Sequence, residues 1–381
     1  MEQRKLFPTQ EIGSLQKPKW QLMGQRGSKL DAEAMAEFRK WNDRMPFALQ
    51  SDPDVQRLLG AAPEKASPEA VQDLAAKFMI TMLDHLGLDR VYDGEARRIE
   101  MYEYAARRIN GLDLLGHVRS FDNKYYLKGA VTGEIGLDKP YHVEEFEFVR
   151  DNSFGTPHLP ITGPYTMADW SYNQFYLDRQ RGWKGRDAKR AAKRDLVVDF
   201  ARKAIRPTLE ALIAQNCQVI QIDEPAAGTI PSETDLVVEG FNEATKGLDA
   251  EFSMHVCFSD YSLMFPAILE AKNCRQWAWE FANRDALGND SYRDILSLFA
   301  EHKDDREIGL GVLNVHTNDI ETPELVRDRI LRSAKIIDPY KLWINPDCGL
   351  RTRSLDVAYA KLENMVKGAK MARKELGGDS E

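Results

Sequence analysis

The 381-residue sequence predicts an α/β fold built from repeated strand and helix units. Short apolar runs of strand length alternate with amphipathic segments of helix length, and polar or glycine residues recur where the apolar runs end. Counting these runs gives eight strands. This count favours a (β/α)8 TIM barrel, whose functional residues lie at the carboxyl ends of its strands. We expect residues 1–381 to form one such barrel with an inserted β-rich segment around 114–160.

The composition is that of a soluble globular protein, with 43% hydrophobic and 29% charged residues. A formal net charge of −8 and the lack of a long basic run disfavour a nucleic-acid partner. No apolar run approaches the roughly 20 residues that span a bilayer, and the polar start lacks a secretion signal, so we expect a cytoplasmic protein without a membrane partner. Four scattered cysteines are too few for a disulfide framework, and in a reducing compartment they are free to bind metal.

In the first part of the chain, residues 6–15 read as a short strand that ends in a Gly-Ser turn. Helices are expected at about 31–45 and 67–86, the second with Ser67 as its N-cap. A strand at 90–95 then precedes a helix over 98–110.

The segment 114–160 interrupts this alternation. Tyr, Phe and Val alternate with charged residues at 124–128 and 144–149, which suggests extra β-structure inserted into the repeat. After it, a basic helical stretch is expected at about 188–215. The remaining strands are predicted at 159–163, 217–223, 252–257, 276–280, 308–314 and 341–345.

A candidate metal site begins on the predicted strand 252–257. Side chains two apart on a strand point the same way, so His255 and Cys257 would face one side together. Zinc with such ligands takes four donors at about 2.0 to 2.3 Å. Cys348 and Glu280 each follow another apolar run and are candidates for the other two positions. A His and a Cys on one strand are more often packed core residues than metal ligands. Here the polar residues at the ends of the other strands favour the metal site.

Polar or glycine residues stop every predicted strand, as an active site at one end of a barrel requires. They are Gly13-Ser14, Gly94-Glu95, Thr162-Gly163, Asp223-Glu224, His255 and Cys257, Glu280, His316 and Asp347-Cys348.

In order and spacing, these motifs resemble the cobalamin-independent methionine synthase family, specifically its catalytic C-terminal barrel and short stand-alone forms. The matching motifs span the chain from near its start to about residue 353. They are Ile12-Gly-Ser14, Asp93-Gly-Glu95, Thr162-Gly-Pro164 with Trp170-Ser171, Ile222-Asp-Glu-Pro-Ala226, His255-Val-Cys257, Glu280-Phe-Ala-Asn283, Val315-His316 and Asn345-Pro-Asp-Cys-Gly-Leu-Arg-Thr-Arg353.

The resemblance implies one Zn²⁺ held by four ligands, which are His255, Cys257, Glu280 and Cys348. It further implies that this zinc presents the thiol of homocysteine as a thiolate, so that the enzyme methylates it to methionine.

The resemblance also assigns the substrate contacts. The Ile12, Gly13 and Ser14 turn would contact the substrate carboxylate, and Glu95 and Asp223 its ammonium group. His316 would donate a proton to the leaving group, and both His316 and Asp223 would be catalytic residues. The ring of Trp170 would stack on a pterin. Each has a plainer alternative, namely a solvated loop acid, an ordinary loop histidine or a core tryptophan.

The methyl donor stays open between 5-methyltetrahydrofolate and a methylated corrinoid, the latter free or on a carrier protein. The chain lacks room for the additional N-terminal barrel of long family members, and residues 122–129 lack the Arg-Cys-containing pattern of the folate side. Two other functions also stay open: an alkyl transfer to another thiol on the same fold, and a barrel with purely structural zinc. A uroporphyrinogen decarboxylase type of barrel would have no use for the His-Val-Cys and Cys348 ligands.

Overall fold

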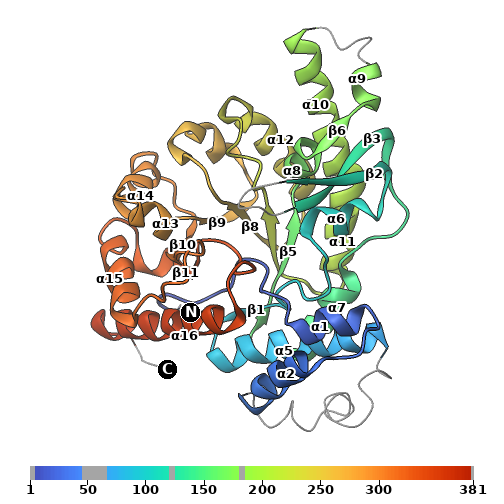
Figure 1. The fold of residues 1–381 in the computed structure, drawn as a ribbon. Coiled ribbons are helices and arrows are strands. Elements are labelled where there is room, and N and C mark those ends of the chain that lie inside the picture. Colours follow the sequence, from blue (N-terminus) through green and yellow to red (C-terminus); the bar gives the residue numbers. More distant parts are fainter. Residues whose placement is uncertain (1–4, 45–66, 120–124, 180–184, 379–381) are drawn as a thin grey trace.

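The computed structural model of the chain describes residues 5–44, 67–119, 125–179 and 185–378. Six parallel strands form the central sheet in the order β11, β10, β9, β8, β7, β5 (Figure 1). Their bounds are β5 Leu159–Thr162, β7 Val219–Asp223, β8 Glu251–Val256, β9 Cys274–Trp279, β10 Glu307–Leu313 and β11 Leu342–Pro346. The predicted α/β class with parallel strands is confirmed, and all six strands lie within two residues of their predicted bounds.

The N-terminal segment lies between β11 and a further short strand. Thr9 forms a parallel bridge with Ile344 of β11, and Gln10 forms one with the first residue of β1 (Arg90–Val91). β1 in turn pairs with β4 (Thr156–Pro157), which directly precedes β5. The strand predicted at 6–15 is therefore reduced to two isolated bridges, and the strand predicted at 90–95 to two residues.

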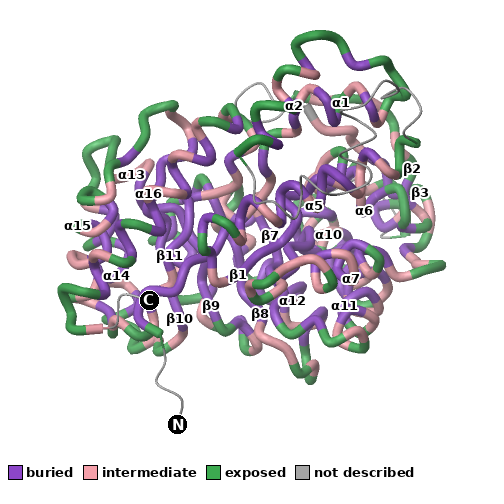
Figure 2. Tube along the Cα trace, turned by 90° about the horizontal axis from the view of Figure 1, so that it is seen from below, coloured by how far each residue is buried: buried purple, intermediate pink, exposed green. Residues whose placement is uncertain are grey.

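Helices surround the sheet, and Figure 2 shows the buried residues gathered around the strands. The strands β5, β7 and β10 are buried at every position, which explains their almost continuous apolar sequences. The helices are α1 Lys19–Gln25, α2 Ala32–Arg44, α5 Pro68–Leu86, α8 Pro164–Asp169, α9 Phe175–Arg179, α10 Arg186–Phe200, α11 Arg206–Ala214, α12 Thr234–Thr245, α13 Ala282–Ala286, α14 Ser291–Glu301, α15 Pro323–Ser333 and α16 Leu355–Glu375. None of the helices in the described ranges is both long and apolar enough to cross a membrane.

The helix ends follow from local sequence. Ser67 caps α5 as predicted, because its Oγ accepts a hydrogen bond from Ala70 N at 3.1 Å. The single helix predicted at 188–215 is instead α10 and α11 with a π-helical turn, Ala201–Ile205, between them. Pro207 follows this turn and has no N–H to donate, which accounts for the interruption. Met45, the predicted end of the second helix, lies outside the described residues.

Extra β-structure is present beside the main sheet. β2 (Ile109–Arg119) and β3 (Tyr125–Leu137) pair antiparallel, and β6 (Ser171–Asn173) joins β3 in parallel. The predicted β-structure at 124–128 thus corresponds to the start of β3, except that Lys124 lies outside the described residues. Because β2 begins at Ile109, the helix predicted at 98–110 is reduced to α6 (Met101–Ala106).

The prediction of β-structure at 144–149 is wrong. This stretch lies in α7 (Val143–Asn152). Phe146 and Val149, three residues apart, are buried, whereas Phe148 is only half-buried. Alternating Glu and Phe residues fit both a strand and one face of a helix. Here the segment is a helix, and its face with Phe146 and Val149 packs into the core.

A buried ion pair joins α16 to the loop after β10. Lys361 Nζ donates to Glu321 Oε2 at 2.7 Å and to the Asn314 carbonyl at 3.0 Å, and its side chain is fully buried. Glu321 Oε1 accepts from Asn314 N at 2.8 Å. The pair therefore fixes the loop that carries His316.

We predict that Lys361→Met lowers the free energy of unfolding by about 3–5 kcal/mol, because Glu321 would keep a buried charge without its partner. Urea unfolding followed by circular dichroism measures this loss. The matched control is Lys367→Met on the same helix, whose pair with Glu363 (2.8 Å) is exposed and worth about 0–1 kcal/mol. Equal losses in the two variants would contradict the role of the buried pair.

Candidate active site and metal centre

A cavity of about 340 Å³ lies at the carboxyl ends of the strands. It brings together all but one of the residues predicted for the site. They are Ile12, Gly13, Ser14, Glu95, Trp170, Asp223, His255, Cys257, His316 and Cys348. The predicted residue that is not part of the cavity wall is Glu280.

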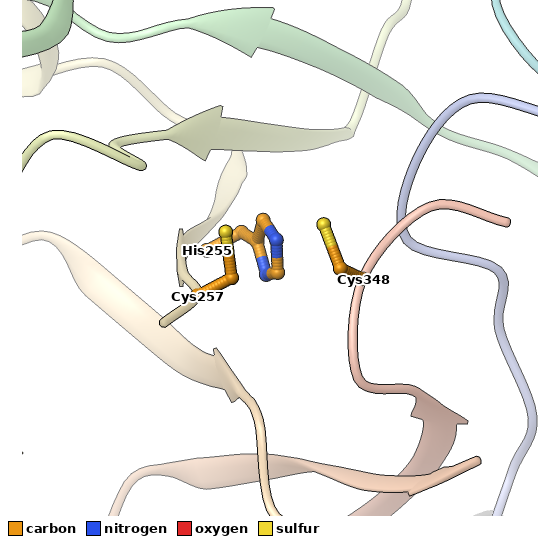
Figure 3. Close-up of side chains that lie close together, drawn as sticks. All are labelled: His255, Cys257 and Cys348. Atoms are coloured by element: carbon orange, nitrogen blue, oxygen red, sulfur yellow. The ribbon is translucent and has the colours of Figure 1, made fainter. Parts of the chain in front are cut away.

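Three candidate metal ligands converge in this cavity (Figure 3). The donor atoms of His255, Cys257 and Cys348 all lie within 4.8 Å of one another. His255 comes from β8, Cys257 directly follows it, and Cys348 follows β11. The Nδ1 of His255 lies 2.8 Å from the carbonyl oxygen of Ala278. Because a carbonyl only accepts, Nδ1 carries a proton, so that in the neutral imidazole Nε2 holds the lone pair that a metal needs.

The charge around His255 favours a cation at this point. Burial by itself lowers the pKa of His255, but Cys348 and Asp223 outweigh it and raise that pKa to about 9. A metal ion would take the place of this positive charge. Two thiols and one imidazole are the donor types that zinc binds, so the residues present fit that metal.

Glu280 is held apart from the other three donors. It follows β9, and within the described part of the chain it does not belong to their 4.8 Å group. Its Oε1 accepts from Asn283 Nδ2 at 2.8 Å, and its Oε2 accepts from Phe258 N at 3.2 Å and lies 3.8 Å from His316 Nε2. Burial would raise the pKa of Glu280, but the nearby His316 ring and the hydrogen bonds from Asn283 Nδ2 and Phe258 N lower it. Its role as fourth ligand stays a prediction.

The turn after the N-terminal bridges is hydrogen-bonded to a neighbour of each acid that is predicted to bind the substrate ammonium group. Leu15 N donates to the carbonyl oxygen of Gly94 at 3.0 Å, next to Glu95. Gln221 Nε2 donates to the Ile12 carbonyl at 2.6 Å and to Asp223 Oδ1 at 2.7 Å. The positions of the turn and of the two acids are therefore coupled.

The same turn packs backbone to backbone against the loop of Cys348. A Cβ atom on Gly13 would lie 2.8 Å from Gly349 Cα, and one on Gly349 would lie 2.5 Å from Ser14 N. Real Cβ atoms do not approach other atoms so closely, so both positions require glycine.

The two acids have unusual surroundings. Glu95 is buried and has a φ of 59°, a left-handed conformation that is uncommon for a residue with a side chain and recurs at functional sites. Asp93 Oδ1 supports this turn by accepting from Glu95 N at 2.9 Å. At Asp223, burial raises the pKa to about 7, although His255 acts in the opposite direction.

Aromatic rings form another part of the cavity wall. Trp170 and Tyr126 of β3 are stacked, with centroids 4.8 Å apart and planes at 29°. The His316 ring lies edge-on to Phe258 with centroids 4.3 Å apart. Sequence reasoning did not select Tyr126 or Phe258, although the alternation at 124–128 contains Tyr126. The other lining residues include Glu100 and Met101, which it did not select. The rest were named only as parts of the matching motifs, without a role in the site: Pro225, Val315, Gly349, Arg351 and Thr352.

Several known proteins are similar to this chain. Residues 55–371 match the family described as cobalamin-independent synthase, catalytic domain. The methionine synthase of Thermoplasma acidophilum is 37% identical over 387 residues, which cover 97% of this chain and 98% of that protein. The methionine synthase of Saccharolobus solfataricus is 35% identical, and the match covers 99% of this chain and 98% of that protein. The solved B12-independent methionine synthase from Shewanella sp. W3-18-1, in complex with selenomethionine, shares the fold with a TM-score of 0.74 at 23% identity, with 98% and 99% covered.

A cavity of strand-end residues and similarity along the whole chain define an enzyme of the methyltransferase class. More particularly, the chain belongs to the cobalamin-independent methionine synthase family. The resemblance seen in its motifs is thereby confirmed.

We predict that Gly349→Ala weakens metal binding, because a methyl group at this position would collide with Ser14 N and displace the adjacent Cys348. Zinc retained per chain after dialysis, measured by elemental analysis, should fall below that of the unchanged protein. Gly116→Ala on β2 is the control, since a Cβ there meets no atom within 4 Å. Full zinc retention by Gly349→Ala would show that the close contact does not position Cys348.

Proposed function

We propose that this enzyme transfers a methyl group to the thiol of homocysteine and forms methionine. The observation that carries the proposal is the convergence of an imidazole, two thiols and two buried carboxylates, Glu95 and Asp223, in one cavity. The donors suit a thiol-binding metal, and the carboxylates suit an ammonium group a short distance away. An amino acid with a side-chain thiol combines both groups.

We propose that the metal is zinc, held by His255, Cys257, Cys348 and Glu280. A zinc ion held there would lower the pKa of a coordinated thiol, so that the substrate thiolate would be available at neutral pH. The Ala278 carbonyl keeps His255 in the required tautomer. Structural zinc sites are closed, whereas Cys257 and Cys348 line an open cavity, which argues against a purely structural metal.

The remaining residues would hold the amino-acid end of the substrate. Glu95 and Asp223 would bind its ammonium group, and the turn at Ile12 to Ser14 its carboxylate. Two acids side by side would repel a sulfonate, so they favour homocysteine over thiols of the coenzyme M type.

For the methyl donor we favour a methylated corrinoid, free or on a carrier protein, over 5-methyltetrahydrofolate. A methyl group on a tertiary amine leaves only if that nitrogen is protonated, which would require an acid such as His316. A methyl group on cobalt needs no such proton. Residues 122–129 lack the Arg-Cys-containing pattern of the folate side of the site, which supports the corrinoid as methyl donor.

We propose further that residues 1–381 form one (β/α)8 barrel. The barrel would close in three steps: β11 is bridged to Thr9, Gln10 is bridged to β1, and β1 pairs with β4. β4 then leads directly into β5, the other edge of the main sheet. The hairpin of β2 and β3 would be its inserted segment.

We predict that Cys257→Ser and Cys348→Ser each lose most of the bound zinc, and that Glu280→Gln binds it more weakly. Elemental analysis after dialysis gives the zinc content per chain. Cys217→Ser serves as control, because Cys217 is buried with its sulfur 3.7 Å from the Val219 carbonyl and is not part of the donor group. If both serine variants kept a full equivalent of zinc, the ligand assignment would be wrong.

The function is tested by assaying zinc-loaded protein with homocysteine and each of three donors: methylcobalamin, and methyl-tetrahydrofolate in mono- and polyglutamate forms. We expect methionine from methylcobalamin, at a rate that His316→Asn leaves unchanged. The exposed His85→Asn on α5 controls for loss of a histidine elsewhere. Folate turnover abolished by His316→Asn would overturn the choice of donor, and absence of methionine with every donor would overturn the function.

A further inference from the structure

A fully buried guanidinium lies directly behind the cavity. Arg98 Nε and Nη2 both point at Glu145 Oε1, at 2.9 and 2.8 Å. Nη2 also donates to the Pro160 carbonyl at 2.7 Å, and Nη1 lies 3.4 Å from Glu95 Oε1. Arg98 therefore contacts two carboxylates, of which only Glu95 lines the cavity.

Glu145 comes from α7, outside the strands that build the site. Its second oxygen, Oε2, lies 2.7 Å from His142 Nδ1. Burial would raise the pKa of Glu145, but Arg98 and His142 outweigh it and hold that pKa well below its usual range. Burial and Arg98 lower the pKa of His142 to about 4, so His142 is neutral and donates to an ionised Glu145. Glu145 thus neutralises Arg98.

The distances show that Arg98 interacts more strongly with Glu145 than with Glu95. The contacts of Arg98 with Glu145 are short and doubled, whereas the single contact with Glu95 is longer than a normal charge-assisted hydrogen bond. The oxygens of Asp93 face Glu95 N at 2.9 Å and Arg97 Nε at 3.9 Å, although its charge also acts on Arg98. Glu95 therefore keeps negative charge to offer to a cation in the cavity. Without Glu145, the nearest acid to Arg98 would be Glu95.

We propose that Glu145 is a positioning residue that keeps Arg98 from neutralising Glu95, and so sets the affinity of the cavity for the amine of its thiol substrate. This inference rests on the proposed function, since it takes Glu95 as a ligand of the substrate ammonium group.

The first test is Glu145→Gln, assayed with homocysteine and with 4-mercaptobutanoate, which lacks the amine. We expect the KM for homocysteine to rise about tenfold or more, as for loss of a charge-assisted contact, with kcat and zinc content nearly unchanged. The preference for homocysteine over the amine-free thiol should fall by the same factor. A general loss of structure would lower kcat/KM for both thiols alike and would overturn the proposal.

Glu103→Gln is the matched control. Glu103 is a buried acid on neighbouring α6, but its partner is Arg107 at 2.5 Å rather than Arg98. We expect its KM for homocysteine to equal that of the unchanged protein. The same rise in KM in both variants would show that Glu145 acts only through local stability.

The double variant Arg98→Met with Glu145→Gln removes the competing cation along with its partner. Replacing both members of a buried pair is tolerated better than removing one, so this variant remains assayable even if the single variant does not fold. We expect its KM for homocysteine to return towards that of the unchanged protein. A KM as high as that of Glu145→Gln would overturn the proposal.

Glu95→Gln separates this inference from the proposed function. If Glu95→Gln leaves the KM for homocysteine unchanged, the ammonium role of Glu95 fails, and the inference fails with it. If Glu95→Gln raises the KM but Glu145→Gln does not, the inference alone fails.

Discussion

The cavity depends on one backbone contact, that between Gly13 and Gly349. The absence of side chains at both positions lets a turn near the start of the chain lie against a loop near its end. The turn is bonded to Gly94 on one side and, through Gln221, to Asp223 on the other. The loop carries Cys348. This contact therefore helps to fix where the candidate metal donors lie relative to the two acids.

The sequence predicts the core of this fold well because its strands are buried on both faces. Every position of β7 is buried, including Gln221 and Asp223, and β7 lies where expected. The failures occur where one pattern fits two structures. The run at 144–149 satisfies both a strand and a helix, and only its three-dimensional surroundings, including the ion pair of Glu145 with Arg98, distinguish them.

The candidate site is predictable to the extent that it lies at strand ends. His255, Cys257, Asp223 and Cys348 meet because parallel strands place their carboxyl ends together. Some contributions from outside the main sheet were not predictable. Tyr126 reaches the cavity through the register of a hairpin with two irregularities, and no local pattern encodes that register. Arg98 and its partner Glu145 are separated in the sequence by α6 and by the hairpin of β2 and β3. No local pattern predicts this ion pair, because only the fold brings the two residues together.

The contact between Gly13 and Gly349 also has a consequence for how the protein is made. Ribosomes release a chain from its N-terminus at on the order of 5–20 residues per second. His255 and Cys257 emerge well before Cys348, so a nascent chain exposes an imidazole and a thiol that lack their third partner. The candidate metal centre can form only when the loop after β11 has docked onto the turn at Gly13. Its three donors are thus brought together late in synthesis, after most of the sheet has left the ribosome.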